Sequence, residues 1–309
     1  MNNLILFGKS NKAILFHNYN EQQILKRGLT LKIAKIINNN IISSFDSENR
    51  EVVVMGRGIG FGKRPSQEID QNKVEKVFRM ESDDETRRLQ DLLIDIPLER
   101  VQLVNKIIHE SQKLIVNKLH KNVYITLIDH INFVIERYNN NIQFQNPLLM
   151  DIKRCYPNEY KAGALAVSYI NKELSLELTD DEAASIAMHF INAELGMDMP
   201  ETIDMAKIIQ NVVKIIKTNF SMELNEESID YERFITHIKF LAQRIVTKRH
   251  LRVGDKELNL LIQIQYPKEY ACTKKIKHYI EKAFEETITD DEMTFLAIHI
   301  KRITMAETI

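Results

Sequence analysis

The stretch Tyr156-Pro157-Asn158-Glu159-Tyr160 shows how this chain is organised, because Tyr266-Pro267-Lys268-Glu269-Tyr270 repeats it about 110 residues later. A threonine-led acidic segment follows each copy at the same offset, at residues 179–182 and 289–292. Each segment is a predicted capping box, in which the threonine caps a helix and the glutamate three residues later reaches back. A repeat of this length has the size of an independent domain rather than of a solenoid unit. We therefore expect two homologous helical domains.

The repeat singles out four of the nine histidines. His189 and His299 follow the two predicted capping boxes at the same offset. Upstream, His130 and His237 also occupy equivalent positions, and each is followed by isoleucine. The remaining histidines have no equivalent in the other copy: His17, His109, His120, His250 and His278.

Several functions are open to these four histidines. A single histidine on an apolar helical face is most often a packed core or interface residue, and this interpretation stays open for each of them. Imidazole also serves as a general base, a metal ligand or a phosphoryl acceptor. The sequence contains no short metal-ligand spacing such as H-E-x-x-H, and no nucleophile or substrate-pocket motif. Elimination leaves phosphoryl acceptance, which needs only an exposed ring nitrogen and a docking surface.

The N-terminal part of the chain has a different pattern. Residues 41–45 and 52–55 are rich in strand-forming side chains, and the segment 46–50 between them predicts a hairpin turn. An earlier turn is expected at the asparagines 38–40. From about residue 72 onward the apolar spacing is helical. Since two or three hairpin-linked strands are marginally stable alone, we expect a homodimer to complete this small β core.

Glycine alternates with larger side chains from Gly56 to Gly62. The segment does not match a phosphate-binding P-loop, because Arg57 stands where the first glycine is needed and Arg64 where serine or threonine is needed. It also fails the dinucleotide pattern G-x-G-x-x-G, because Phe61 follows the third glycine. One interpretation is a tight turn with backbone bulges. The other is an RNA site, in which arginine and phenylalanine stack on unpaired bases.

Composition limits the class of protein. The chain has 309 residues, of which 44% are hydrophobic and 28% charged, and its few glycines and prolines (9 and 6) favour helices. The net charge of −1 gives no overall basic field, so any RNA site must be a small part of the surface. Cys155 and Cys272 have no metal-ligand spacing, which favours two reduced thiols in a cytosolic protein. No apolar run is long enough for a membrane helix, and no signal peptide is expected.

Together these motifs resemble the BglG/SacY family of bacterial transcriptional antiterminators. The strings Lys32–Asn40 and Val52–Phe61 are similar to the RNA-binding module of that family. The two helical repeats are similar to its paired regulatory domains, which are targets of the sugar phosphotransferase system. The resemblance extends over about residues 31–305. It implies a small antiparallel β RNA-binding domain followed by two homologous all-α helical-bundle regulatory domains, at residues 31–86, 94–199 and 200–309.

The family resemblance also implies a function. The β module would dimerise and bind a hairpin in nascent mRNA, so that an overlapping terminator hairpin cannot form. Phosphorylation of His130 and His189 by way of the sugar permease would inhibit, and phosphorylation of His237 and His299 by the phosphocarrier protein would activate. Neither enzymatic activity nor a metal or organic cofactor is implied, and the resemblance favours a β-glucoside operon and a cytoplasmic location. RNA-contacting positions are implied at Lys35, Asn40, Gly56, Arg57 and Phe61.

One departure from the family lies at the N-terminus. Leu31 stands where the family has its initiator methionine, after thirty residues without a counterpart. Lys26-Arg27-Gly28 is compatible with a purine-rich ribosome-binding sequence, and Leu31 with a UUG start codon. We therefore expect residues 1–30 to be upstream DNA read as protein. The alternative is a genuine extension that hinders dimerisation of the module.

Two rival classes of protein require features that the sequence does not contain. A DNA-binding activator carrying the same repeats would need a helix-turn-helix before them, but residues 31–62 are strand-rich. A phosphohistidine enzyme or phosphocarrier would need a nucleotide or substrate site. A purely structural helical bundle would leave the doubled histidines and the glycine-rich segment unexplained.

Overall fold

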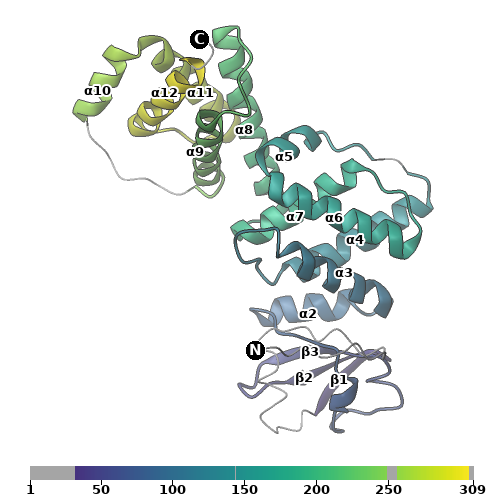
Figure 1. Cartoon of the computed structure of the whole chain (residues 1–309). Helices are drawn as coiled ribbons and strands as arrows, with labels where there is room; N and C mark the ends of the chain where they lie inside the picture. Colours follow the sequence, from purple (N-terminus) through teal and green to yellow (C-terminus); the bar gives the residue numbers. More distant parts are fainter. Residues whose placement is uncertain (1–31, 143, 249–255, 306–309) are drawn as a thin grey trace, which may run out of the picture. The chain divides into compact units, whose positions relative to one another are not determined.

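The computed structural model describes residues 32–142, 144–248 and 256–305 (Figure 1). The chain divides into two compact units after Glu99. The first unit contains a β-sheet and the second is helical. The sequence therefore predicted the fold class correctly. The expectation that residues 1–30 are not part of the protein lies outside the described residues.

The first unit contains a four-stranded antiparallel sheet, in the order β1-β2-β3-β4. Its strands are Ile33–Asn38, Ile41–Phe45, Glu51–Met55 and Lys76–Phe78. The turns predicted at residues 38–40 and 46–50 connect the first three strands. β4 lies where the sequence predicted helix, and that prediction was wrong because a three-residue strand is too short to show an alternating pattern.

A helix of the same chain packs against the sheet. Leu89 and Leu93 at the end of α2 (Asp83–Leu92) are fully buried, and α2 packs against β3. The Asn38 side chain donates to the Leu93 carbonyl oxygen at 2.9 Å, which ties α2 to β1. The sequence predicted a homodimer on the ground that the strands alone form too small a core. Since α2 adds buried leucines to the sheet, that ground for dimerisation is weaker. A buried aliphatic cluster that does not include these leucines contains Ile33, Ile42, Val52, Val54, Ile59, Ile69 and Val77.

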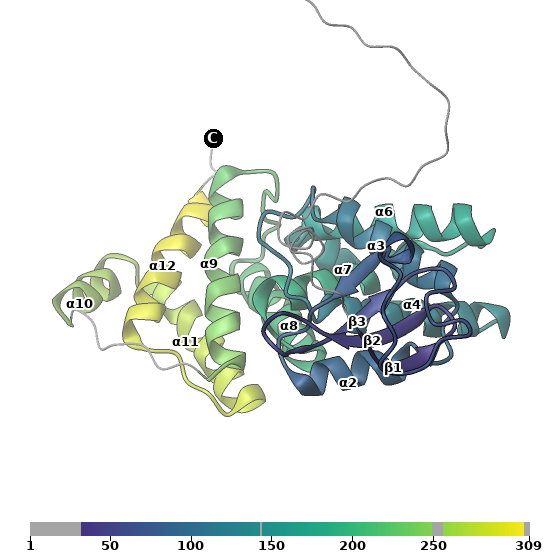
Figure 2. The same ribbon diagram turned by 90° about the horizontal axis from the view of Figure 1, so that it is seen from below.

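The second unit consists of helices in two similar sets. Between the two sets lies α8 (Met199–Phe220). The loop that the sequence predicted at residues 138–146 begins slightly later than expected, because the preceding helix, α4, extends to Asn139. Figure 2 shows α9, α11 and α12 side by side, in agreement with the packing of α12 against both of the others. The first set is α3 (Leu98–Ser111), α4 (Val123–Asn139), α5 (Leu149–Cys155), α6 (Pro157–Leu174) and α7 (Asp180–Leu195). The second set is α9 (Ile229–Val246), α10 (Lys256–Gln265), α11 (Pro267–Phe284) and α12 (Asp290–Met305).

The two predicted capping boxes differ in the structure. In the second copy the box is formed: the Thr289 backbone N–H donates to Glu292 at 2.8 Å, and the Glu292 backbone N–H donates to the Thr289 hydroxyl at 3.2 Å. In the first copy the side chain of Thr179 makes no capping hydrogen bond. That prediction was wrong for the first copy: there the Thr179 hydroxyl donates to the Asp181 carboxylate at 3.2 Å, and the Glu182 backbone N–H donates to the Thr179 carbonyl oxygen at 3.1 Å.

Other features of the described residues bear on the class of protein. None of their helices is long and apolar enough to cross a lipid bilayer. In the same part of the chain, no three His, Cys, Asp or Glu side chains are grouped so that they could hold a metal ion. Cys155 and Cys272 are buried free thiols. Burial raises the pKa of both thiols, that of Cys272 to about 11, so neither is a reactive thiolate at neutral pH.

Candidate functional site

The first predicted pair of histidines meets between two helices. His130 on α4 and His189 on α7 have ring centroids 4.5 Å apart, with an angle of 43° between the ring planes. The side chain of His130 is 17% exposed, and His189 is 9% exposed. The fold therefore brings together two residues that the repeat had singled out separately, and it shelters both of them.

An ion pair between α4 and α7 lies beside these rings. Arg137 follows His130 by two helical turns and donates to a Glu182 carboxylate oxygen. Both side chains are nearly buried, with 11% and 8% exposed. The other Glu182 oxygen lies 4.0 Å from His130 Nε2, which is too far for a hydrogen bond. The carboxylate thus faces both the arginine and the histidine.

Polar atoms of the first pair lack partners within the described part of the chain. These atoms are His130 Nε2, His189 Nδ1 and one oxygen of Glu182. Burial, aided by Arg137, lowers the pKa of His130 to about 4, and burial together with His130 lowers the pKa of His189 well below its usual value. Both imidazoles are therefore neutral at pH 7. A neutral imidazole keeps a ring lone pair, which is the form that attacks phosphorus.

The second predicted pair repeats this geometry with greater access to solvent. His237 on α9 and His299 on α12 have ring centroids 4.1 Å apart, with an angle of 38° between the planes. His299 is 8% exposed, whereas His237 lies on the surface. Burial is the main cause that lowers the pKa of His299 to about 4. The nearby side chains of His237, Arg302 and Arg233 lower this pKa further, because their positive charges disfavour a protonated ring. Asp230 opposes that shift.

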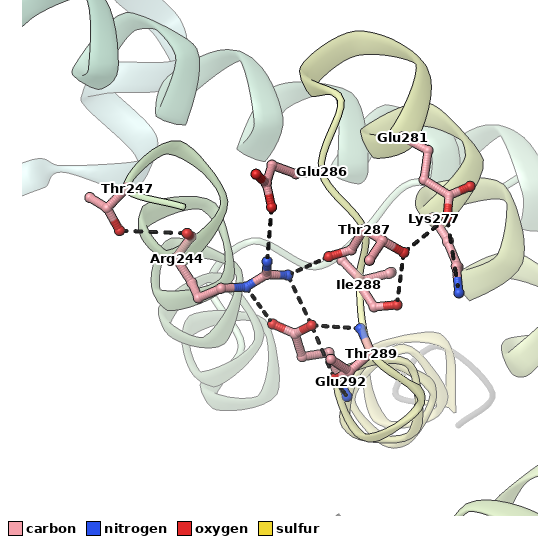
Figure 3. Close-up of polar contacts among 9 residues, drawn as sticks. All are labelled: Arg244, Thr247, Lys277, Glu281, Glu286, Thr287, Ile288, Thr289 and Glu292. Carbon is pink, nitrogen blue, oxygen red and sulfur yellow. Dashed lines mark hydrogen bonds and ion pairs between the residues drawn. The ribbon is translucent and has the colours of Figure 1, made fainter. Parts of the chain in front are cut away.

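A second ion pair, equivalent to the first, anchors α9 to the start of α12 (Figure 3). Arg244 donates through Nε and Nη2 to the two oxygens of Glu292, each at 2.9 Å. The same guanidinium donates to the Thr287 carbonyl oxygen at 2.9 Å and lies 3.9 Å from Glu286. Because Glu292 also closes the capping box with Thr289, one carboxylate holds both helices. These contacts set the separation of α9 and α12, and hence of their histidines.

Sequence reasoning missed these arginine–glutamate pairs, although the repeat contains the signal. Arg137 and Arg244 each follow a singled-out histidine by seven residues, because 137 − 130 and 244 − 237 are both 7. The glutamates each precede a singled-out histidine by seven, because 189 − 182 and 299 − 292 are both 7. Extending the comparison of the two copies along the flanking helices would have identified both pairs.

The glycine-rich segment forms a turn that the Asn40 side chain holds. The Asn40 Oδ1 atom accepts from the Gly58 backbone N–H at 2.8 Å, and its carbonyl oxygen accepts from Gly56 at 2.9 Å. Gly56 lies against the backbone of Lys73, because a Cβ at residue 56 would fall 1.7 Å from the Lys73 carbonyl oxygen. The close approach that glycine permits here is therefore to the chain itself. The interpretation as a tight turn is confirmed.

Three other predicted RNA-contacting residues present side chains to solvent. Phe61 is 70% exposed, and Lys35 also lies on the surface. The Arg57 side chain is 71% exposed and pairs with the equally exposed Glu99 at 3.1 Å. An ion pair between exposed side chains contributes little to stability, so a phosphate could replace Glu99 at small cost. The first unit thus displays an exposed cation on β1 and an exposed cation and aromatic ring in the glycine-rich segment.

A small sheet with exposed basic and aromatic side chains, followed by two helical domains with paired histidines, defines the class of nucleic-acid-binding regulators. Comparison with known families agrees. Residues 31–87 match the CAT RNA binding domain, and residues 105–193 and 210–303 each match the PRD domain. The chain belongs to the family of transcription antiterminators that combine a CAT RNA-binding domain with PRD domains.

Curated relatives support this assignment. The chain is 40% identical to the transcription antiterminator LicT of Bacillus subtilis, over 88% of this chain and 99% of LicT. It is 38% identical to a β-glucoside operon antiterminator of Dickeya chrysanthemi, over 88% of this chain and 96% of the relative. A crystal structure of GlcT CAT-PRDI is 30% identical and covers 54% of this chain and 99% of that chain, with a TM-score of 0.47.

Proposed function

We propose that this antiterminator binds a hairpin in nascent mRNA and thereby prevents an overlapping terminator hairpin from forming. The observation that carries the proposal is the pairing of the four repeated histidines, two by two, behind a CAT RNA-binding domain. We assign the RNA-binding domain to residues 31–86, acting as a homodimer, and the two regulatory domains to residues 94–199 and 200–309. The protein acts in the cytoplasm as a regulator, without enzymatic activity of its own.

Within the RNA-binding domain, we propose two kinds of role. Lys35, Arg57 and Phe61 contact RNA directly, through phosphate attraction and base stacking, because their side chains are exposed. Asn40 and Gly56 contribute by holding the backbone of the turn, as their hydrogen bonds and close approach to Lys73 indicate. Their own contact with RNA stays a prediction.

Regulation acts through the histidines. We propose that the phosphocarrier protein of the phosphotransferase system phosphorylates His237 and His299 and so activates the protein. Phosphorylation of His130 and His189 by way of the sugar permease inhibits it. The depressed pKa values of His130 and His299 support these roles, because both rings are neutral nucleophiles at pH 7. The name of the Dickeya relative favours a β-glucoside operon as the controlled unit.

Binding of an antiterminator-type RNA hairpin by the full chain tests the first part of the proposal. Phe61→Ala should remove base stacking and weaken binding at all salt concentrations, by about 1–3 kcal/mol. Arg57→Ala should weaken binding and reduce the slope of affinity against salt concentration by about 1, as expected for one lost phosphate contact. Arg87→Ala removes an exposed arginine on α2 and serves as the control, because it lies outside the glycine-rich turn.

Two results would contradict the proposal. If the folded wild-type chain binds the hairpin no better than a scrambled RNA, the role in antitermination fails. If the variant carrying both His237→Ala and His299→Ala is activated by the phosphocarrier as well as the wild type is, the regulatory assignment of that pair fails.

A further inference from the structure

The two histidine pairs differ in the charged side chains one helical turn away. Arg233 precedes His237 by four residues on α9, and Arg302 follows His299 by three residues on α12. Residues three or four apart lie on the same face of a helix. Because the rings of His237 and His299 are in contact, the two arginines flank a single site from two helices.

Electrostatics and exposure agree with this placement. Both arginines act on His299, since Arg302 and Arg233 each help to lower its pKa. The Arg233 side chain is 62% exposed and has a weak contact with Asp230 at 4.0 Å. Arg302 is also exposed, and within residues 32–142, 144–248 and 256–305 it forms no ion pair with a carboxylate. Both guanidinium groups can therefore turn toward an anion on the ring pair without breaking a buried contact.

The first pair has no such side chains at the equivalent positions. His130 and His237 are 107 residues apart, and the same offset aligns Arg233 of the second copy with Thr126 of the first (233 − 107 = 126). His189 and His299 are 110 residues apart, and the same offset aligns Arg302 of the second copy with Asn192 of the first (302 − 110 = 192). The arginine beside the first pair, Arg137, is already held by Glu182.

We propose that Arg233 and Arg302 form a binding site for the phosphoryl group that His237 or His299 carries. The inference rests on the proposed function and assigns to that site the residues that stabilise its modified state. A phosphorylated ring carries nearly two negative charges and three acceptor oxygens, and a guanidinium matches such a group with paired hydrogen bonds. Arg233 and Arg302 are positioning residues, because they act on the phosphoryl group after it is transferred to the ring.

Phosphoramidate is a suitable probe, because this small phosphoryl donor needs no docking surface. The ring nitrogen uses its lone pair to form the new N–P bond, while the P–N bond of phosphoramidate breaks and ammonia leaves. The full chain is incubated with phosphoramidate at neutral pH, and phosphate at each histidine is followed over time by mass spectrometry. The donor is then removed, and the rate of phosphate loss from each histidine is measured.

In the variant with Arg233→Gln and Arg302→Gln, phosphate at His237 and His299 should decrease about tenfold, the effect expected from losing charge-assisted hydrogen bonds. Phosphate at His130 and His189 should not change. The variant with lysine at both positions should recover part of the loss, because it keeps the charge. Arg87→Gln serves as the control for an exposed arginine elsewhere. Hydrogen exchange of α9 and α12 should match the wild type, which excludes misfolding.

Two outcomes overturn the inference, and they are distinguishable. If a folded double glutamine variant accumulates and retains phosphate at His237 and His299 as the wild type does, the arginines have no such role. If the wild type takes phosphate at none of the four histidines, from either phosphoramidate or the phosphocarrier, then the proposed function fails and the inference fails with it.

Discussion

The two PRD domains place two histidines in ring contact in the same way, but they shelter the pair differently. In the first domain the His130 side chain is 17% exposed, His189 is buried, and an arginine–glutamate pair lies beside them. In the second domain His237 is on the surface, and two exposed arginines flank the pair. The two copies of the fold therefore keep the same ring contact but differ in how far solvent reaches it. We infer that His237 is accessible to a phosphoryl donor in this conformation, whereas the sheltered His130, His189 and His299 become accessible only when their helices move.

The largest expected effect concerns the ion pairs that hold these helices. Arg137→Met and Arg244→Met should each destabilise their own PRD domain by about 3 kcal/mol, because each leaves a nearly buried glutamate without its partner. Hydrogen exchange of the full chain, resolved by domain, measures both losses. Arg87→Met, which breaks an exposed pair with Asp84, should change stability by less than about 0.5 kcal/mol.

A second variant separates burial of charge from packing. Replacing both Arg137 and Glu182, by methionine and leucine, should recover most of the stability that Arg137→Met loses, because no charge remains buried. Equal destabilisation by the single and the double variant would show that the ion pair matters only through its packing, and would remove the electrostatic part of the comparison.

Close helix packing distinguishes the first domain from the second. A Cβ at Gly163 on α6 would lie 2.1 Å from the Ala183 carbonyl oxygen on α7, whereas the equivalent residue in the second copy is Thr273. Gly163→Ala should therefore destabilise the first domain by about 3 kcal/mol. Thr273→Ala should cost the second domain only about 1 kcal/mol, through the lost hydrogen bond to Tyr270. Similar losses for both variants, measured by hydrogen exchange, would contradict the difference in packing.

Acid should affect the first domain more than the second. The folded pKa of His130 is about 4, against 6.5 for an ordinary histidine, and that of His189 is also depressed. Between pH 6.5 and pH 4 the unfolded chain therefore binds protons that the folded domain excludes. The free energy of unfolding of the first domain decreases as pH falls through this range. The loss between pH 7 and pH 4 should be about 3 kcal/mol for His130. His299 has the same depressed pKa, but its partner His237 lies on the surface.

Unfolding of the full chain in urea at pH 7, 6, 5 and 4, with exchange resolved by domain, measures this difference. His130→Gln should flatten the pH dependence of the first domain and leave that of the second unchanged. A wild-type stability of the first domain that stays constant from pH 7 to pH 4 would refute the assignment of a buried, neutral histidine pair.

The smallest expected effect concerns the helix starts. Thr289→Ala removes a capping hydrogen bond at the start of α12 and should cost about 1 kcal/mol. Thr179→Ala should be nearly neutral, because Thr179 makes no capping hydrogen bond at the start of α7. Thermal unfolding of the two variants checks this, and a larger loss for Thr179→Ala would show that the capping box forms in both domains.

Local patterns in the sequence predicted much of the fold and the candidate site. The repeat identified the four histidines, and the strand and turn composition identified β1 to β3. The features missed all depend on partners far along the chain. Glu182 pairs with Arg137, which lies 45 residues earlier in the chain, and glycine is required at residue 56 because a Cβ there would meet the Lys73 carbonyl oxygen. β4 and the contribution of α2 to the sheet core likewise depend on tertiary contacts that spacing does not reveal.

The central claim is that the second histidine pair can be reached through the exposed His237, whereas both histidines of the first pair are sheltered. The most direct test is the initial rate of phosphorylation of each histidine in the wild-type chain by phosphoramidate, because access of a small donor depends on the site alone. We predict that His237 and His299 together acquire phosphate faster than His130 and His189. Equal rates for the two pairs, or a faster rate for the first pair, would contradict the account.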